Sequence, residues 1–397
     1  MPSAVRTPVY LDYQATTPVD PRVVAAMRPW LEEHFGNPHS ADHVFGWVAH
    51  EAVEAARAAV AELINAPARD VIFTSGATES NNMAIRGVFE AAFPARDHVV
   101  TVATEHKCVL ESARLVARLG GRVTILPVDG TGLVDLDRLA DAIDDRTALV
   151  SVMAVNNEIG TIQPLAEIGA LCRARGVLFH TDAAQGFGKI PLDVEEMRID
   201  LMSISGHKIY GPKGIGALYL RSARPRVRIR PLILGGGQER GLRSGTLAPH
   251  QCAGLGEAAR IAAREMDRDA AHARTLFRRL WAGLEKAVPG IVLNGHPERR
   301  WWGNLNVTVP DLRAEELMAR LPDLAISSGA ACGSGSGEPS YVLQAIGRSR
   351  EEAERSLRLG FGRFTTEAEI DFAVARIAEA VEAARRTGTA ALARDPR

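Results

Sequence analysis

Cysteine is scarce in this sequence, with four residues in a chain of 397. They are widely separated, and no two of them form a C-x-x-C pair: Cys108, Cys172, Cys252 and Cys332. This spacing excludes the dense disulfide framework of small secreted domains and offers no cysteine-based metal site. We therefore expect a protein of the reducing cytoplasm.

An excess of one charge and long apolar runs are also absent. The 47 basic and 48 acidic residues give a formal net charge of −1, so no overall positive field favours nucleic acid or an anionic membrane. No stretch approaches the roughly 18 apolar residues of a membrane span, and the N-terminus does not read as a signal peptide. We expect neither a membrane partner nor direct nucleic-acid binding.

Lysine is rare as well, because only five of the 47 basic residues are lysine and the other 42 are arginine. Arginine stays charged, whereas a lysine amine can lose its proton and enter covalent chemistry. Three of the five lysines fall between residues 189 and 213: Lys189, Lys208 and Lys213. This part of the chain is therefore a candidate for amine chemistry.

Short apolar runs alternate with amphipathic stretches from about residue 50 to residue 260. This alternation predicts an α/β fold with a mostly parallel sheet between helices. The expected strands are Val71–Thr74, His98–Ala103, Arg122–Pro127, Ala148–Val155, Val177–His180, Leu201–Ile204 and Ala217–Leu220. Helical stretches such as Ala49–Ile64 and Pro164–Arg175 lie between them.

The pattern changes after about residue 260. A long helical run, Leu255–Ala287, precedes a strand-like segment, Asn304–Val309, a Gly/Ser-rich stretch at 327–338 and a second helical run, Thr366–Arg386. We expect a large domain over residues 16–260. A smaller α+β domain is expected from residues 1–15 and 261–397.

Ligands of open α/β sheets bind beyond the carboxyl ends of the strands, so polar residues that follow each strand are candidates. Thr78, in SGATESNN, stands where a helix N-terminus would offer free amides to an anion, although it could equally serve as a helix cap. His106, in TEHK, could stack on a ring or move a proton, and a surface histidine is the ordinary alternative.

Two further strand ends carry an acid and an amine. Asp182, in HTDAAQ, could keep a cationic ring nitrogen protonated; a metal pair with His180 lacks a third ligand, and a solvated aspartate is the plain reading. Lys208, in SGHKIYGPKG, lies among small residues, where an amine can form a Schiff base with an aldehyde cofactor. A phosphate loop is excluded, because Pro212 stands where its lysine is required.

One cysteine differs from the other three in its surroundings. Cys332 lies in SSGAACGSGSG, where no apolar pattern would bury it and a glycine-rich backbone could carry a thiolate into and out of a site. An incidental cysteine in a linker is the alternative.

The ordered set Thr78, His106, Asp182, Lys208 and Cys332 resembles the cysteine desulfurases of the class V aminotransferase family, in particular the group that serves iron–sulfur cluster assembly and nitrogen fixation. The similarity extends over nearly the whole chain. It includes YLDYQATTPVDPRV, FGNPHS, VNNEIG, GGGQERGLRSGT and LGFGRFTTEAEID. The resemblance implies the type I fold of pyridoxal-phosphate (PLP) transferases, with a mostly parallel seven-stranded sheet, and a homodimer with active sites at the interface.

The resemblance also implies a role for each site residue. Lys208 would bind the cofactor aldehyde, Asp182 would pair with the pyridinium nitrogen, and His106 would stack on the ring. The remaining expected contacts are Gln185 with the phenolic oxygen; Ala77, Thr78, Ser205, His207 and Thr246 of the partner subunit with the phosphate; and Asn157, Arg358 and Asn37 near the substrate carboxylate.

The implied reaction converts L-cysteine to L-alanine and leaves a persulfide on Cys332 for an acceptor protein, either an iron–sulfur scaffold or a protein of nucleic-acid thio-modification. A selenocysteine lyase or an aminotransferase of the same family would use Lys208 and Asp182 equally well. Cys332 separates these readings, because only persulfide chemistry needs a thiol on a mobile loop. An inactive partner in a sulfur-transfer complex is the non-enzymatic alternative, and the complete residue set argues against it.

Overall fold

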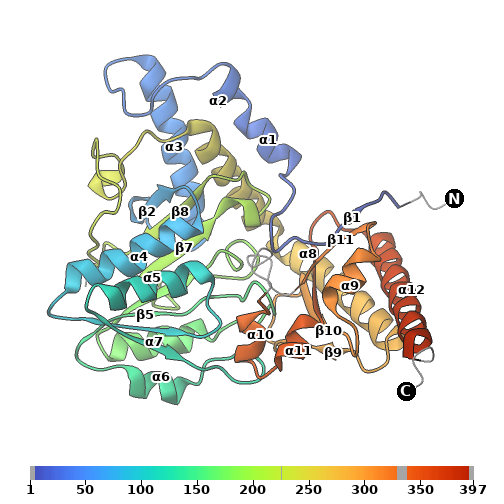
Figure 1. Ribbon diagram of the computed structural model, residues 1–397. Helices are drawn as coiled ribbons and strands as arrows, with labels where there is room; N and C mark the ends of the chain where they lie inside the picture. The colour runs from blue at the N-terminus through green and yellow to red at the C-terminus, as the bar shows by residue number, and fades with distance from the viewer. Residues whose placement is uncertain (1–4, 225, 329–337, 393–397) are drawn as a thin grey trace.

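The structure is a computed structural model that describes residues 5–224, 226–328 and 338–392. Cys332 and most of the predicted 327–338 loop lie outside the described residues. Figure 1 shows a larger part, coloured blue to yellow, beside a smaller part, coloured orange to red. The long helix α8 and the N-terminal segment run between the two parts (Figure 1).

The larger part contains a seven-stranded sheet in the order β2-β8-β7-β6-β5-β3-β4. Only β8 runs antiparallel to its two neighbours, so the sheet is mostly parallel, as predicted. The strands are β2 (Val71–Thr74), β3 (His98–Val102), β4 (Arg122–Leu126), β5 (Thr147–Ser151), β6 (Leu178–Asp182), β7 (Leu201–Ser205) and β8 (Gly216–Leu220).

Helices cover both faces of this sheet, which explains why its strands are almost continuously apolar. Ile72, Val99 and Leu149 face one hydrophobic cluster with α4 and α5, whereas Phe73, Val100 and Val150 face the other cluster with α3, α7 and α8. The helices of this part are α1 (Pro21–Met27), α2 (Pro29–Glu32), α3 (Val44–Glu62), α4 (Ala77–Ala92), α5 (Lys107–Arg118), α6 (Leu136–Ala142), α7 (Leu165–Ala174) and α8 (Pro249–Ala287), with single turns η1 (Ala68–Asp70), η2 (Gly206–Lys208) and η3 (Glu239–Gly241).

The smaller part is built on an antiparallel sheet in the order β12-β13-β10-β9. Its core contains apolar residues from the second half of α8 and from α9 and α12, together with Val9 and Leu11 of the N-terminal segment. The elements are β1 (Val9–Tyr10), β9 (Val292–Leu293), β10 (Asn304–Thr308), β11 (Leu324–Ala325), β12 (Ser327–Ser328), β13 (Ser356–Gly360), α9 (Ala314–Ala319), α10 (Tyr341–Ala345), α11 (Arg350–Glu354) and α12 (Glu367–Leu392).

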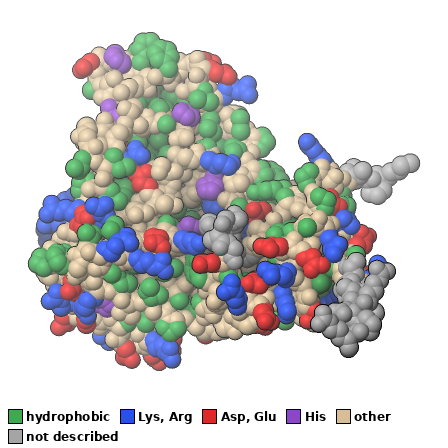
Figure 2. Space-filling view, viewed as in Figure 1, with side chains coloured by type: hydrophobic (Ala, Val, Ile, Leu, Met, Phe, Trp, Pro, Cys, Tyr) green, Lys and Arg blue, Asp and Glu red, His purple; other side chains and the backbone are tan. Residues whose placement is uncertain are grey.

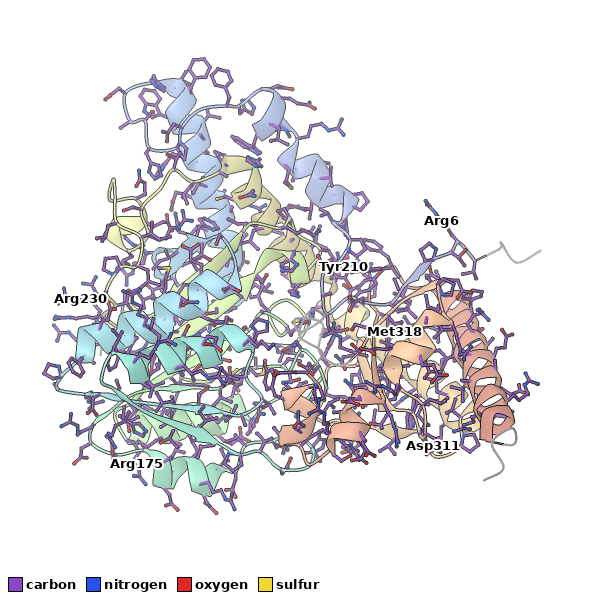
Figure 3. The ribbon with its side chains drawn as sticks, in the orientation of Figure 1. Arg6, Arg175, Tyr210, Arg230, Asp311 and Met318 are labelled. Atoms are coloured by element: carbon purple, nitrogen blue, oxygen red, sulfur yellow. The ribbon has the colours of Figure 1, made fainter. Side chains whose placement is uncertain are left out.

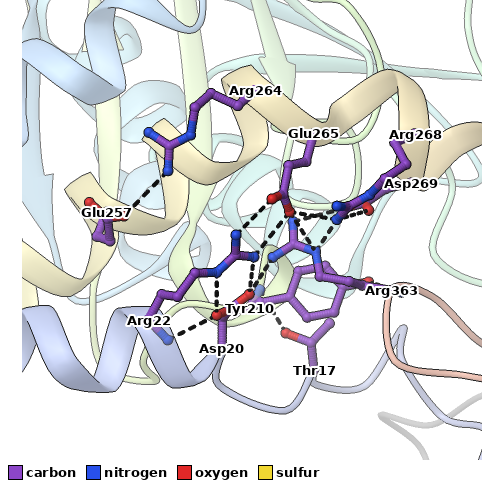
Figure 4. A network of polar contacts seen from close by, with 10 residues as sticks. All are labelled: Thr17, Asp20, Arg22, Tyr210, Glu257, Arg264, Glu265, Arg268, Asp269 and Arg363. Carbon is purple, nitrogen blue, oxygen red and sulfur yellow. Dashed lines mark hydrogen bonds and ion pairs between the residues drawn. The ribbon is translucent and has the colours of Figure 1, made fainter.

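A network of charged residues joins the two parts near α8 (Figure 4). Arg363, which follows β13, forms ion pairs with Asp20 at 2.7 Å and with Asp269 of α8 at 2.8 Å. Asp20 also caps α1 and pairs with Arg22, which in turn reaches Glu265 of α8 at 2.7 Å. Tyr210, labelled between the parts in Figure 3, lies under the Arg363 guanidinium at 4.2 Å from its ring centre.

The predicted strands all exist, and their bounds differ from the prediction by a few residues. The largest difference is at β5, which ends at Ser151 and not at Val155, because the chain leaves the sheet there toward the site. Helix α8 is one continuous element that crosses the predicted domain boundary at residue 260. The division into residues 16–260 on one side and 1–15 with 261–397 on the other stays a prediction.

Candidate active site

The candidate site lies at the edge of the large sheet where its parallel strands end. Asp182 is the last residue of β6, Lys208 lies in the turn η2 directly after β7, and His106 and Asn157 come shortly after β3 and β5. Thr78 lies in the first turn of α4, which begins after β2. Because these strands are parallel, their carboxyl ends bring the side chains to one edge.

Lys208 is held by main-chain carbonyl groups of the N-terminal segment. Its Nζ donates to the carbonyl oxygen of Ala15 at 2.7 Å and also to that of Gln14. The half-buried amine therefore lies between the sheet edge and residues 14–15. This placement leaves a primary amine at the centre of the site.

Asp182 is a buried carboxylate with two firm donors. Its Oδ2 accepts from Asn81 Nδ2 at 2.7 Å, and its Oδ1 accepts from the backbone N–H of Ala184 at 2.9 Å. Neither donor is a cation, so the carboxylate keeps its capacity to attract a positive group. Glu105 lies nearby and is fully buried, and burial together with the charge of Asp182 raises its pKa well above the usual range.

His106 caps helix α5 with its own ring. Its Nδ1 accepts from the backbone N–H of Cys108 at 3.2 Å and lies 3.0 Å from Cys108 Sγ. A ring nitrogen that accepts a backbone N–H carries no proton, so the neutral ring holds its proton on Nε2.

Ala77 and Thr78, two of the predicted phosphate-binding residues, lie in the first turn of α4. The helix begins at Ala77 after Gly76, whose φ of +148° favours glycine, and no side chain caps its first amides. His207 bonds to Thr16 Oγ1 through Nδ1 at 3.1 Å, and burial together with the charges of Lys208, Lys213 and Lys189 lowers its pKa to about 4. The free amides at the N-terminus of α4 suit a dianionic group.

Arg358 lies on β13 and brings the smaller part to the site. Its side chain is 1% exposed, pairs with Asp12 at 2.8 Å and donates to the carbonyl oxygen of Asn157 at 3.1 Å. The predicted carboxylate-binding residues Asn157 and Arg358 are thus neighbours. Ser327 also donates to Asp12 at 3.3 Å, so β12, which occupies the first two residues of the predicted 327–338 loop, lies beside this ion pair.

Two predicted residues, Asn37 and Thr246, lie on connecting segments of the larger part. Asn37 lies in the connection between α2 and α3 at the upper end of the molecule in Figure 1, where its side chain accepts from the His39 backbone. Thr246 is exposed on the loop between η3 and α8. Cys332 lies outside the described residues, so its role, like those of Asn37 and Thr246, stays a prediction.

His180 does not act as a metal ligand in this arrangement. Its Nδ1 bonds to Ser151 Oγ at 2.8 Å and its Nε2 to Ser203 Oγ at 3.0 Å, so both ring nitrogens are occupied by hydroxyl groups. Burial lowers its pKa to about 3. Among the described residues no group of three potential ligands gathers around a common point.

These groups fit PLP better than a metal or a nucleotide. The site offers an amine for an aldehyde at Lys208, a buried carboxylate for a cationic ring nitrogen at Asp182, and the N-terminus of α4 for a phosphate. The first amides of α4 have no side-chain cap, so they are available to a phosphate. The donor set therefore matches the predicted cofactor.

Comparison with known families decides the assignment. The model of the aminotransferase class-V family matches residues 9–372. The chain belongs to the class V aminotransferase family. This class V aminotransferase is 55% identical over 378 residues to a cysteine desulfurase IscS of Rickettsia bellii, a match that covers 95% of this chain and 92% of the relative.

Solved structures agree with the sequence comparison. A NifS-like protein is 37% identical, has a TM-score of 0.88 and covers 94% of this chain and 99% of its own. A structure described as SspA in complex with cysteine is 37% identical, with a TM-score of 0.80, and covers 90% of this chain and 99% of its own. This class V aminotransferase is thus a PLP-dependent enzyme of the cysteine desulfurase group, and its predicted fold class is confirmed.

Sequence reasoning missed several residues that build the site. Gln14 and Ala15 act through main-chain carbonyls, which no residue type reveals, although they lie in the motif YLDYQATTPVDPRV. Asn81 lies three residues after Thr78 in SGATESNN, and its contact with Asp182 depends on the packing of α4 against the sheet. Lys189, which donates to Gln185, is one of the three lysines between residues 189 and 213, and this concentration of lysine is visible in the sequence.

Proposed function

We propose that this enzyme converts L-cysteine to L-alanine and transfers the sulfur, through a persulfide on Cys332, to an acceptor protein. The observation that carries the proposal is the convergence of Lys208, Asp182 and His106 at one sheet edge, beside the Arg358–Asp12 pair. The relatives named as cysteine desulfurase support the substrate, as does the neighbour described in complex with cysteine.

Each residue has a defined task in this proposal. When bound, PLP supplies an electron sink for negative charge on the substrate Cα. Lys208 binds the cofactor aldehyde and moves a proton at Cα, Asp182 keeps the ring nitrogen protonated, and His106 stacks on the ring. Gln185 contacts the phenolic oxygen, and the phosphate is held by Ala77, Thr78, Ser205 and His207.

The substrate is held through its carboxylate by Arg358 and Asn157. The Cys332 thiolate attacks the substrate sulfur, so that an S–S bond forms and the C–S bond breaks. The electron pair of the broken bond stays on the substrate carbon, which takes up a proton and leaves as alanine. The persulfide on Cys332 then passes its outer sulfur to a thiol of the acceptor protein.

A homodimer completes the proposed site. The end of the molecule formed by α2 and α3 carries large exposed apolar side chains, seen as hydrophobic surface at the top of Figure 2: Leu31, Phe35, Phe45 and Trp47. Leu234, on the chain that leads to Thr246, is also exposed, at 80%. Such a surface is typical of a subunit interface, and Thr246 of the partner subunit would contact the phosphate across it.

We further propose a cytoplasmic location. Cys108, Cys172 and Cys252 are free thiols, which suits a reducing compartment. Among the described residues, no helix combines the length and apolar character that a bilayer crossing requires. The acceptor is proposed to be an iron–sulfur scaffold or a protein of nucleic-acid thio-modification.

The test is alanine release from L-cysteine in the presence of a thiol reductant, measured for the holoenzyme and its Cys332→Ser variant. We expect alanine from the wild type only, while both proteins bind PLP and show its colour. Equal alanine release from the variant would remove Cys332 from the reaction. A coloured wild type that releases no alanine would overturn the substrate assignment.

A further inference from the structure

Lys189 is a buried lysine that the proposed reaction does not use. Its side chain is 8% exposed, and among the described residues it pairs with no carboxylate. Its Nζ donates to Gln185 Oε1 at 2.8 Å and lies 5.9 Å from the centre of the Trp301 ring. Burial of an amine without an opposite charge costs free energy, so this position calls for an explanation.

The backbone that carries Lys189 packs closely against neighbouring elements. Gly188 has a φ of +67°, and a Cβ at that position would lie 3.0 Å from Ala262 Cβ. A Cβ on Gly186 would lie 3.1 Å from Ala154 Cβ. The turn from Gln185 to Lys189 therefore has little room for side chains at Gly186 and Gly188. Lys189 at the end of this turn donates to Gln185 at its start.

The contact between Lys189 and Gln185 does not depend on the charge of the amine. Burial, and secondly the positive charge of Lys208, lower the pKa of Lys189 to about 7. A lysine amine has hydrogens to donate in both protonation states. The Nζ therefore remains a donor to Gln185 Oε1 across the neutral pH range.

Two neighbours fix the orientation of the Gln185 amide. Lys189 offers only donors when charged, so the amide oxygen must face it; the carbonyl of Gln14 only accepts, so the amide nitrogen must face that group, at 2.9 Å. The same Gln14 carbonyl accepts from Lys208 Nζ. The second hydrogen of Gln185 Nε2 has no acceptor among the described residues.

We propose that Lys189 is a positioning residue that holds the Gln185 amide with its nitrogen toward the phenolic oxygen of the bound cofactor. With the opposite orientation, the amide oxygen would face both the Gln14 carbonyl and the phenolic oxygen, and would repel them. Lys189 thereby makes Gln185 a hydrogen-bond donor at that oxygen. This inference rests on the proposed function, because it requires PLP beside Lys208.

The test compares the full-length holoenzyme with Lys189→Met, Gln185→Leu and the double variant. The readouts are the PLP dissociation constant and the pH midpoint of the colour change of bound PLP. We expect Lys189→Met to weaken PLP binding about tenfold and to raise the midpoint by about one pH unit, because the phenolic oxygen loses a donor and then holds the Schiff-base proton more tightly. Lys286→Met, at an exposed position on α8, is the control for loss of a lysine.

The double variant separates positioning from a direct effect of the lysine charge. If Lys189 acts through Gln185, Lys189→Met changes neither readout further in the Gln185→Leu background. An equal midpoint shift in that background would overturn the proposal, as would a Lys189→Met single variant that lowers only the melting temperature.

If Lys189→Met does not fold, Lys189→Arg replaces it, because arginine keeps a donor. Lys189→Arg should bind PLP within about threefold of the wild type. A tenfold loss of PLP binding in the folded Lys189→Arg variant contradicts the proposal. A wild type that binds no PLP would instead contradict the proposed function.

Discussion

Glu158 is a fully buried carboxyl group beside the candidate substrate site. Its Oε2 accepts from Ser340 Oγ at the start of α10, and its neighbour in sequence is Asn157. Burial raises the pKa of Glu158 to about 7, although Ser340 and the charge of Arg358 oppose the shift. The protonated form is therefore favoured in the folded protein.

This shift predicts a specific pH dependence of stability. The folded pKa of Glu158 lies above the unfolded value of 4.5. The stability linked to protonated Glu158 is therefore fully present below the unfolded pKa and is lost as the pH rises through the folded pKa of about 7. Glu158→Gln keeps the shape without the titration. Urea unfolding at pH 5 to 8 should show the wild type losing on the order of 1–3 kcal/mol relative to the variant. A difference that stays constant with pH would contradict this account.

At the scale of elements, a buried ion pair anchors the turn η3 to helix α3. Arg57 makes two 2.7 Å bonds to the carboxylate of Glu239, which also accepts from the backbone N–H of Phe73 at 2.7 Å. Glu239 and Arg240 both have a positive φ, so this contact holds a backbone that would otherwise relax. The loop that leads to Thr246 starts from this anchored turn.

Loss of this pair should destabilise the whole protein. Glu239→Gln leaves the buried Arg57 charge with only the exposed Glu54, at 3.0 Å, as its counter-ion, and we expect a loss of up to about 3–5 kcal/mol in the free energy of unfolding. The matched control is Glu316→Gln, which breaks an exposed pair with Arg320 and should cost less than about 1 kcal/mol. Denaturant titration at one protein concentration measures both. Equal effects of the two variants would show that the Arg57 pair does not anchor η3.

The elements were largely predictable from the sequence, and the contacts within the site were not. Strands such as Val71–Thr74 are apolar on both faces, which marks them in the sequence, and Asp182 and Lys208 stand directly after such strands. Gln14 and Ala15 are distant from Lys208 in sequence and act through carbonyls, so no local pattern reveals them. The pairing of β1 with β11 and of Asp12 with Arg358 likewise depends on tertiary packing.

At the scale of the whole molecule, the site combines both parts of the chain. The larger sheet supplies Lys208, Asp182 and His106, whereas β13 of the smaller part supplies Arg358. The ion pairs of Arg363 with Asp20 and Asp269 hold these parts together near the site (Figure 4). Described residues before and after Cys332 in the sequence also contact this region: Ser327 donates to Asp12, the partner of Arg358, and Ser340 donates to Glu158.

The most direct test of the central claim is mass spectrometry of the Cys332 peptide after the holoenzyme reacts with L-cysteine without a reductant. The account predicts one added sulfur atom on Cys332 in the wild type and none in Lys208→Ala, because the amine is needed before sulfur can move. An unmodified Cys332 in a wild-type enzyme that still forms alanine would contradict the account, since the sulfur would then leave by another route.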